Sequence, residues 1–348
     1  MNEKDSPFIS IIILNWNAGE ILLECVKSVM NSKFTNFEII LVDNNSHDNS
    51  HKKCKQIFQN IRLIENDENL GYCEGNNVGI RNALGKFIVI LNPDTKVNPE
   101  WLDEFLNDYK KFGDCLYQPK FLSIDNNSVL GSTGNFIHLF GLGYARGLYE
   151  NDEGQFEASQ VINYASGTCL FVPRHLIEKI GLFDSFIFAY HDDLDLGWRA
   201  AQIGITSRYV PKSIVYHHLS GYSFQWSKLK FFYMERNRKY CLLTHYSRST
   251  FYKILPFLLI IEIPIFFFYV KKRMTISFFK IIFDLLKNRK HINKRYKEIQ
   301  KFRKINDHEL IKNFQNEIHV PKNISSQNTN KLFNLILNLF SIISRKMI

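Results

Sequence analysis

The sequence predicts an α/β fold with a mostly parallel central sheet, followed by a basic helical extension. Over residues 1–100, short apolar runs alternate with segments whose apolar residues recur at helical spacing, a pattern typical of βαβ units. Residues 1–220 contain 19 Lys and Arg against 27 Asp and Glu, whereas residues 221–348 contain 25 against 7. We therefore expect an acidic α/β domain at 1–225, a helical basic and apolar region at 226–322, and a linker with a short amphipathic helix at 323–348.

Size and cysteine content narrow the class of protein. With 348 residues and 45% hydrophobic content, the chain can bury a full α/β core and still supply an appendage. Its six cysteines form no CxxC pair and no regular spacing, so neither a zinc site nor a disulfide framework is indicated, and a reducing compartment is expected. The first apolar run, 8–14, is too short for a signal-peptide core or a spanning helix.

The elements of the α/β region follow in order along the chain. Residues 8–14 form an unbroken apolar run, as expected for a parallel strand covered on both faces. Residues 20–32 place their apolar side chains on one helical stripe. The order then continues with a buried strand at 37–42, a polar helix at 47–59, a short strand at 61–65, a helix at 69–84 and a strong strand at 86–91.

The second half of this region has weaker periodicity. We expect loops and short antiparallel strands around an acceptor site at 115–165, where Gly, Asn and aromatic residues are frequent. Apolar character then returns, and the later elements are a strand at 167–172, a short helix after Pro173, a helix at 196–203 and two strands at 205–210 and 213–216.

Polar side chains follow three of the predicted strands at the points where they end. These clusters are Asn15-Trp16-Asn17, Asp43-Asn44-Asn45 and Asn92-Pro93-Asp94. In open α/β sheets the ligand lies beyond the carboxyl ends of the strands. The spacing therefore predicts a ligand site formed by these three turns.

The acidic residues suit a nucleotide-diphosphate ligand. No GxGxxG follows the first strand and no GxxxxGK[ST] is present, which argues against dinucleotide and P-loop folds. Asp43, Asp94, a cluster of Asp192, Asp193 and Asp195, and the pair His217-His218 remain. Carboxylates of this kind can hold a nucleoside, ligate a hard divalent cation, and remove a proton from an acceptor hydroxyl.

Five segments in the correct order carry a family resemblance. ISIIILNWN, EIILVDNNSHDNS, NLGYCEGNNVGIRNALGKFIVILNPDT, SGTCLFVPRHLIEKIGLFDSFIFAYHDDLDLGWRA and VYHHLSGYS resemble the successive signatures of family 2 inverting glycosyltransferases of the GT-A fold, especially the rhamnosyltransferase-like branch. The resemblance covers about residues 8–224. It implies transfer of a hexosyl or deoxyhexosyl group from a nucleotide-sugar donor.

The resemblance also implies roles for individual residues. The metal-binding DxD position falls on Asn92-Pro93-Asp94, which leaves Asp94 as the charged ligand of Mg²⁺ or Mn²⁺, with His217 as a second candidate. Asp43 is expected at the base or ribose, and Asn76 or Asn77 beside the diphosphate. The full set of expected donor contacts is Asn15, Asn17, Asp43, Asn45, Gly71, Asn76, Asn77, Asn92 and Gly167.

The catalytic base of the family falls on Asp192-Asp193, where the family has a Glu-Asp pair. Asp193 is expected to be the base and Asp192 to support it, because adjacent carboxylates raise one another's pKa. Asp195 is expected to cap the next helix. The implied reaction is a single displacement with inversion at the anomeric carbon.

Each assignment has a structural alternative. Asp43 can cap the following helix, Asn92-Pro93-Asp94-Thr95 has the composition of a type I turn, and acidic residues favour the first turn of a solvated helix. The spacing of Gly71, Gly75 and Gly79 is by itself a weak signal of a ligand loop. One of His217 and His218 is expected to face away from the site.

The basic extension has the composition of a membrane-associating region. Residues 254–270 are apolar but contain Pro256, Glu262 and Pro264, so an interfacial or re-entrant segment is favoured over a true span. Residues 276–287 are amphipathic and are followed by a lysine stripe through 304, which suits an anionic leaflet. The alternative is a helix packed on the catalytic domain with its basic face in solvent.

The leading hypothesis is therefore a metal-dependent glycosyltransferase at the cytoplasmic face of the membrane, peripheral or monotopic, with a single span as the alternative. Its expected donors are UDP-, GDP- or dTDP-sugars, and its acceptor a glycan or a lipid-linked glycan of the cell envelope. A nucleotidyltransferase and a non-catalytic nucleotide-sugar-binding membrane adaptor are the alternatives. We expect no nucleic acid partner, because apolar residues interleave the basic tail.

Overall fold

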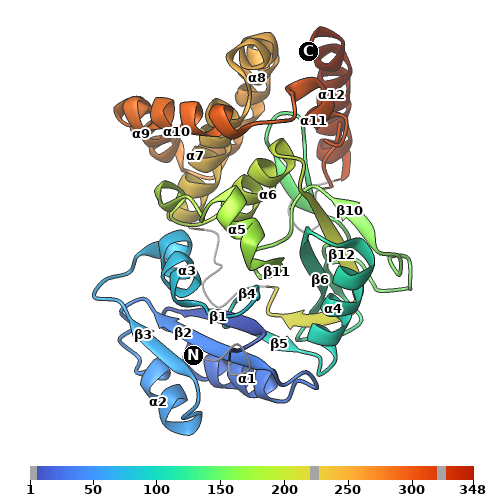
Figure 1. Cartoon of the computed structure of the whole chain (residues 1–348). Coiled ribbons are helices and arrows are strands. Elements are labelled where there is room, and N and C mark those ends of the chain that lie inside the picture. The colour runs from blue at the N-terminus through green and yellow to red at the C-terminus, as the bar shows by residue number, and fades with distance from the viewer. Residues whose placement is uncertain (1–5, 220–226, 320–326) are drawn as a thin grey trace. The chain divides into compact units, whose positions relative to one another are not determined.

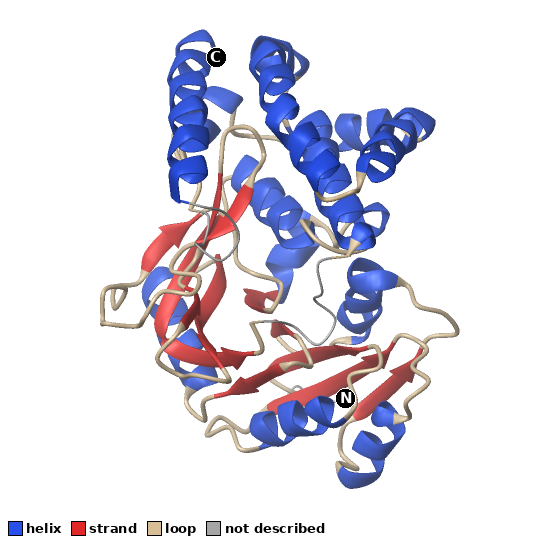
Figure 2. Cartoon of the chain, turned by 180° about the vertical axis from the view of Figure 1, so that it is seen from behind, coloured by secondary structure: helices blue, strands red, loops and turns tan. Residues whose placement is uncertain are grey.

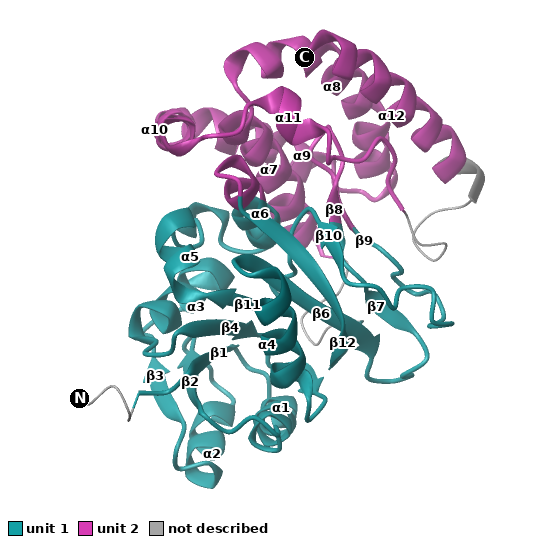
Figure 3. Ribbon diagram, turned by 45° about the vertical axis from the view of Figure 1, so that its right-hand side comes forward, with its two compact units in different colours: residues 1–135, 145–197, 205–225 teal, residues 136–144, 198–204, 226–348 magenta. Residues whose placement is uncertain are grey.

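The computed structural model describes residues 6–219, 227–319 and 327–348 (Figure 1). The chain divides into two compact units, coloured separately in Figure 3. Unit 1 comprises residues 1–135, 145–197 and 205–225, and unit 2 comprises residues 136–144, 198–204 and 226–348. The predicted boundary at 225 and the first residues, 323–326, of the predicted linker region at 323–348 lie outside the described residues.

Unit 1 is built on a sheet whose first four strands are parallel. Along the sheet the order is β3, β2, β1, β4, then β11, which runs antiparallel to β4. The register places Asn15 opposite Asp43, so two of the predicted polar clusters begin side by side. These strands are β1 (Ile9–Asn15), β2 (Phe37–Asp43), β3 (Arg62–Glu65), β4 (Phe87–Leu91) and β11 (Cys169–Pro173).

The remaining strands correct two expectations. β6 (Cys115–Ser123) is a nine-residue strand, buried throughout, where loops and short strands were expected. Its apolar pattern is broken by Gln118 and Lys120, whose polar ends are satisfied inside the fold by Ser132 and Asp152 respectively. β6 pairs with β11 antiparallel and with β12 (Thr206–His217) parallel. The sequence did not predict this central strand, because its buried polar residues, which have hydrogen-bond partners in the fold, give it a sequence pattern like that of a loop.

β12 is one strand where two were expected. Its pairing with β6 shifts register between Val210 and Ile214, around Pro211, which has no N–H to donate to the ladder. Such an irregularity bends a strand without ending it. The short strands β5 (Thr95–Val97) and β10 (Gln160–Ile162) pair with β12, and β7 (Leu130–Ser132) pairs with β6.

Helices cover both faces of this sheet, as Figure 2 shows. α1 (Glu20–Met30) and α4 (Trp101–Phe112) share a core with the side chains of β1 that point to one face, Ile9, Ile11 and Ile13. α2 (Ser50–Ile57) contributes Cys54 to the same core. The other elements of unit 1 are α3 (Gly71–Asn82), α5 (Arg174–Ile180), the 3-10 turn η2 (Ser185–Ile187) and the first part of α6 (Asp192–Gln202).

α3 lies on the opposite face, and its glycines explain how. A Cβ atom at Gly75 would lie 2.6 Å from Leu14, and one at Gly79 would lie 2.4 Å from Ile12. Glycines four residues apart therefore form a flat helical stripe that lets α3 approach β1 closely. Their spacing reflects helix packing and does not indicate a ligand loop.

Unit 2 is helical. α7 packs against α9 and α10, and α8 packs against α9 and α12. α8 is long and apolar enough to cross a bilayer by length and composition. α12 begins at Gln327, within the region 323–348 where a linker and a short amphipathic helix were expected. The helices are α7 (Lys228–His245), α8 (Arg248–Lys271), α9 (Thr275–Lys287), α10 (Arg289–Phe302), α11 (Asp307–Ile311) and α12 (Gln327–Met347), with a two-stranded ribbon of β8 (Asn135–Ile137) and β9 (Gly143–Ala145).

Candidate active site

The ends of β1 and β2 are joined by a buried hydrogen-bond network. Asn15 Nδ2 donates to Asp43 Oδ1 at 2.7 Å, and Asp43 Oδ2 accepts from the Ser46 N–H at 2.8 Å. The ring of His51 lies 3.2 Å from the same carboxylate, through Nδ1. Asn15 and Asp43 are almost fully buried. Asp43 therefore holds the turn that follows β2, and its contact with a nucleoside stays a prediction.

The helix-cap alternative for Asp43 is wrong. α2 begins at Ser50 with Asn49 at its N-cap position, several residues beyond Asp43. Asn17 and Asn45 both adopt left-handed backbone conformations, with φ of 54° and 59°, which asparagine tolerates better than most residues. These asparagines shape the two turns, and the exposed Trp16 lies in the first of them.

Three of the expected donor contacts, Gly71, Asn76 and Asn77, lie in the first turns of α3. Asn77 is engaged on both sides by the Phe183 peptide, since its Nδ2 donates to the Phe183 carbonyl at 2.9 Å and its Oδ1 accepts the Phe183 N–H at 3.0 Å. Its amide therefore anchors that segment, and a role at the diphosphate stays a prediction. Asn76 Oδ1 is buried and has no hydrogen-bond partner, whereas the Gly71 carbonyl accepts from Asn44.

The Asn92-Pro93-Asp94 segment is a turn that buries a carboxylate. The Asn92 N–H donates to the Thr168 carbonyl at 2.9 Å, and the Asn92 carbonyl accepts from Thr95 Oγ1 at 2.7 Å. Asp94 is 6% exposed, and its Oδ1 is buried with no hydrogen-bond partner. The turn and ligand interpretations are thus compatible, because the turn is what positions Asp94.

His217 is the histidine that faces this turn. Its Nε2 lies 3.4 Å from Asp94 Oδ2, and it is the register partner of Thr95 in the β5–β12 pair. His218 instead donates its backbone N–H to the Asp94 carbonyl, and its ring lies 3.9 Å from Asp125. A carboxylate with one free buried oxygen beside an imidazole fits a divalent cation, and Asp94 and His217 are the side chains that would hold it.

The Asp192-Asp193 pair begins α6. Asp193 Oδ2 accepts the Gly167 N–H at 3.2 Å and Oδ1 accepts the Leu194 N–H at 2.8 Å. Burial raises the pKa of Asp193 to about 6. Burial and the neighbouring Asp193 charge raise the pKa of Asp192 well above its usual range. The pair therefore consists of a buried acid, Asp192, and a partly buried one, Asp193, with unequal affinities for protons.

The backbone before this pair is strained. Phe188, Tyr190 and His191 have φ of 65°, 65° and 64°, a region that side-chain-bearing residues rarely adopt. Asp195 was expected to cap the helix, but α6 already begins at Asp192, and Asp195 lies in its first turn, fully buried. The prediction for Asp195 is wrong because the helix starts at Asp192, the first residue of the acidic cluster. Asp192 and Asp195 are buried and not solvated.

Tyr72 is a part of this site that the sequence did not reveal. Its hydroxyl donates to the Gly167 carbonyl at 2.6 Å, while the N–H of Gly167 donates to Asp193. A Cβ atom at Gly167 would lie 2.6 Å from the Tyr72 oxygen and 3.0 Å from Asp192 Oδ2. Only a glycine fits between them. Ser46 and His51 were missed as well, since single polar residues in loops have no periodic signal.

Hydrogen bonds from backbone N–H groups connect the acidic pair at the start of α6 with the turn that carries Asp94. Gly167 holds Asp193, and the next residue, Thr168, holds Asn92 at the turn that carries Asp94. This connection is possible because Leu91 and Cys169 are register partners in β4 and β11. The expected base and the expected metal ligand therefore both attach to the segment that enters β11.

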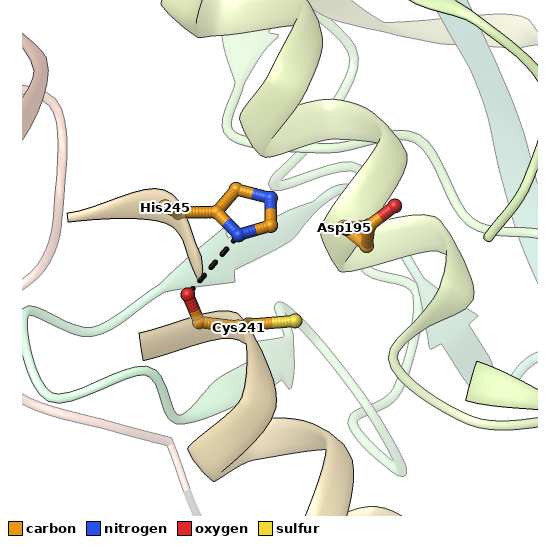
Figure 4. Close-up of side chains that lie close together, drawn as sticks. All are labelled: Asp195, Cys241 and His245. Carbon is orange, nitrogen blue, oxygen red and sulfur yellow. Dashed lines mark hydrogen bonds between the residues drawn. The ribbon is translucent and has the colours of Figure 1, made fainter. Parts of the chain in front are cut away.

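Two further ligand-type side chains, Cys241 and His245, lie one turn apart on α7. In Figure 4, the Nδ1 of His245 points to the Cys241 carbonyl one turn earlier in α7, at 3.0 Å, an ordinary helical spacing. Asp195, drawn in the same figure, belongs to unit 1. Asp94 and His217 therefore remain the candidate metal ligands.

Comparison with known proteins identifies the family of this domain. Residues 10–181 match the family described as glycosyl transferase family 2. The hexosyltransferase Agl10 of Haloferax volcanii, of low-salt glycan biosynthesis, is 26% identical over 57% of this chain and 62% of its own length. An N-acetylglucosaminyl-diphospho-decaprenol L-rhamnosyltransferase of Mycobacterium tuberculosis is 24% identical over 60% of this chain and 76% of its own.

Solved structures show the same fold. GalNAc-T7, crystallised with UDP, GalNAc and Mn²⁺, aligns with a TM-score of 0.59 and 17% identity over 74% of this chain and 52% of that one. Its fold is of the GT-A type, an α/β fold with a mostly parallel sheet, as expected for this sequence. The chain therefore carries a glycosyl transferase family 2 domain with the GT-A fold.

Proposed function

We propose that this protein transfers a sugar from a nucleotide-sugar donor to a glycan or lipid-linked acceptor, with inversion of the anomeric centre and Asp193 as the base. The observation that supports this most is the segment Gly167-Thr168, which attaches Asp193 on one side and the Asp94 turn on the other. A transferase of this kind needs a base for the acceptor and a place for the donor diphosphate within one site.

The protonation equilibrium of Asp193 suits a general base. With a pKa of about 6, it is mostly ionised at neutral pH and yet binds a proton more tightly than an ordinary aspartate. In the proposed step, the acceptor O–H proton moves to Asp193 as the oxygen attacks the anomeric carbon. The bond from that carbon to the donor phosphate breaks, and the nucleoside diphosphate leaves with the bonding electrons.

The other residues bind and orient. Asp94, with its free buried oxygen, and His217 are the side chains expected to hold Mg²⁺ or Mn²⁺, which when bound would neutralise the charge of the leaving diphosphate. The network of Asn15, Asp43 and Ser46 sets the shape of the turns where the nucleoside is expected. Gly167 leaves room between Tyr72 and the acidic pair.

The names of the relatives guide the choice of substrates. The Mycobacterium tuberculosis relative is named for an acceptor linked to decaprenol through a diphosphate, so a lipid-linked acceptor is our first choice here. We expect the donor to be a sugar linked to UDP, GDP or dTDP. A lipid-linked acceptor also favours a location at the cytoplasmic face of the membrane, as a peripheral or monotopic protein.

The decisive experiment compares Asp193→Asn with the wild-type chain. We first identify the donor by thermal shift against UDP-, GDP- and dTDP-sugars with Mn²⁺, because a bound donor raises the unfolding temperature. We then expect Asp193→Asn to lower kcat by about 10²- to 10⁴-fold, the usual contribution of a general base, with donor binding kept. Asp125→Asn, at an exposed side chain, serves as the control.

Two outcomes would count against this proposal. Retained turnover in Asp193→Asn removes the assignment of the base. A wild-type chain that binds a nucleotide-sugar but transfers nothing to any acceptor would instead indicate a membrane adaptor. Measuring the anomeric configuration of the product by NMR tests inversion separately, since a product with the anomeric configuration of the donor contradicts a single displacement.

A further inference from the structure

Three helices of unit 2 expose rows of large apolar side chains. On α9, Ile276, Phe279 and Phe283 are 74%, 57% and 69% exposed, at spacings of one helical turn. α8 and α12 present similar rows. We call this set the apolar helical surface; its members are Leu259, Ile260, Ile263, Phe267 and Val270 on α8, Ile276, Phe279, Ile282, Phe283 and Leu286 on α9, and Leu332, Leu335, Leu339, Ile342, Ile343 and Met347 on α12.

The same helices already bury apolar residues on their inner sides. α8 buries Ile254, Leu258 and Ile261, α9 buries Ile281, and α12 buries Leu337. The inner rows pack within the unit, whereas the residues of the outer rows are largely exposed to solvent. A helix that is apolar on both sides in water usually faces a second apolar partner.

The outer rows belong to helices in direct contact. Phe266 of α8 packs on Phe278 of α9, with ring centroids 5.1 Å apart, and Phe257 of α8 packs on Phe340 of α12 at the same separation. α8 therefore lies between α9 and α12, as the contacts among the helices also indicate. Exposed apolar residues on three neighbouring helices exceed the scattered surface residues expected of a soluble domain.

The charges beside these rows are basic. Residues 221–348 carry 25 Lys and Arg against 7 Asp and Glu, a net charge of +18. Interfacial helices typically carry Lys and Arg beside their apolar face, where these side chains can contact anionic lipid head groups. The exposed ones at the ends and edges of α8, α9 and α12 are Lys271, Lys272, Arg273, Lys280, Lys287, Lys331 and Lys346.

The inner side of α8 shows how it would meet a bilayer. Glu262, near the middle of α8, forms ion pairs with Arg238 and Lys239 of α7, and Arg238 also pairs with Glu235 at 2.6 Å. Arg238 is 1% exposed. If α8 crossed the bilayer, one of two things would follow. Either the charged residues of α7 would enter the hydrocarbon with it, or Glu262 would lie there without its ion-pair partners. Each would cost free energy.

We propose that α8, α9 and α12 form a monotopic docking surface that lies in one leaflet of a bilayer containing anionic phospholipid, with α8 parallel to the membrane and not across it. Apolar side chains of the three helices enter the acyl boundary, and the lysines and arginines beside them meet the lipid phosphates. This inference refines the membrane location proposed above and does not require that sugar transfer occurs.

The first test measures binding of the full-length chain to vesicles by sedimentation. We expect binding to phosphatidylcholine vesicles that contain phosphatidylglycerol, and weaker binding without phosphatidylglycerol or at high salt. The double variant Phe279→Glu with Phe283→Glu should bind at least about tenfold more weakly, because it places two charges in the acyl boundary. The matched control is Ile57→Glu with Leu84→Glu, two exposed apolar residues of unit 1.

Several results would overturn the docking surface. If the wild-type chain ignores both kinds of vesicle, or if the double variant binds as well as the control, the surface does not meet lipid. If the wild-type chain is a dimer that the double variant separates, and neither binds vesicles, then a second copy covers these helices. Sugar transfer to a soluble acceptor, measured in parallel, separates failure of docking from failure of the proposed catalysis.

The second test distinguishes an in-plane α8 from a crossing one. All six native cysteines are buried, so single cysteines introduced by Ser249→Cys and Lys272→Cys report on the two ends of α8. The ends are separated by about 34 Å along the helix. With a membrane-impermeant maleimide, we expect both to react in inverted membrane vesicles and neither in intact spheroplasts. Reaction of one end in each preparation would show a crossing and overturn the in-plane arrangement.

Discussion

Two carboxylates, Asp193 of unit 1 and Glu235 of unit 2, have opposite electrostatic surroundings. In unit 1, burial raises the pKa of Asp193 to about 6, and backbone N–H groups donate hydrogen bonds to its carboxylate. In unit 2, burial acts in the same direction on Glu235, but the charges of Arg238 and Lys239 lower its pKa to about 2. A buried acid with cations beside it stabilises a fold, whereas one held by backbone alone remains ready to take a proton.

The largest expected effect is on stability, and it comes from removing the cation that compensates the buried charge of Glu235 in unit 2. Arg238→Met leaves Glu235 and Glu262 without their main buried partner, and loss of one member of a buried ion pair typically costs about 3–5 kcal/mol. We expect a loss of this size in the free energy of unfolding at neutral pH, measured by urea denaturation. Lys312→Met, which breaks the exposed pair with Glu309, should cost less than about 1 kcal/mol.

The sign of the pH dependence sharpens this prediction. A carboxyl whose folded pKa is lowered from 4.5 to about 2 contributes stability that is present above the unfolded pKa and lost as the pH falls toward 2. The gap between the wild-type chain and Arg238→Met should therefore narrow on acidification below pH 4.5. A gap that stays constant from about pH 7 to about pH 3 would show that Arg238 acts through packing and not through Glu235.

The next effect concerns the pH dependence of the transfer rate, which depends on Asp193, the carboxylate without a cation beside it. Because the base must be ionised to accept a proton, kcat/KM should fall about tenfold for each pH unit below the pKa of Asp193, about 6, and level off above it. An ordinary aspartate, which titrates near about pH 3.9, would keep the plateau well into the acidic range. A profile flat down to about pH 5 would contradict the raised pKa of the base.

These two carboxylates also show how far the sequence could predict the molecule. The alternation of apolar runs and helical stripes predicted the parallel strands β1 to β4 and the turns that end them, because local patterns determine them. It did not predict β6, whose Gln118 and Lys120 are buried with partners far away in sequence. Nor did it predict the start of α6, since three strained residues, Phe188, Tyr190 and His191, precede it.

The candidate site follows the same division. Asp94, Asp192 and Asp193 were singled out because the family resemblance places the metal ligand and the base on them. The partners that hold them, Gly167 and Tyr72, lie at sequence distances that no local pattern connects. Roles at the donor remain predictions for the residues named from the sequence, whereas their mutual contacts are now described.

The smallest effect tests whether Tyr72 positions the base. Tyr72→Phe removes the hydroxyl that donates to the Gly167 carbonyl at 2.6 Å, and the N–H of that same residue holds Asp193 Oδ2. We expect kcat to fall about three- to tenfold, in line with the roughly 0.5–1.5 kcal/mol of an ordinary hydrogen bond, with KM for the donor unchanged. The apparent pKa of the rate profile should shift, because the surroundings of Asp193 change.

A matched control is available in the same unit. Tyr117 also donates its hydroxyl to a backbone carbonyl, that of Gly113 at 2.5 Å, but neither residue contacts the acidic pair. Tyr117→Phe should lower the unfolding temperature about as much as Tyr72→Phe while leaving kcat and the pH profile unchanged. If the two variants behave alike in all three measurements, Tyr72 has only a structural role, and the Gly167 peptide is held at Asp193 by the strand alone.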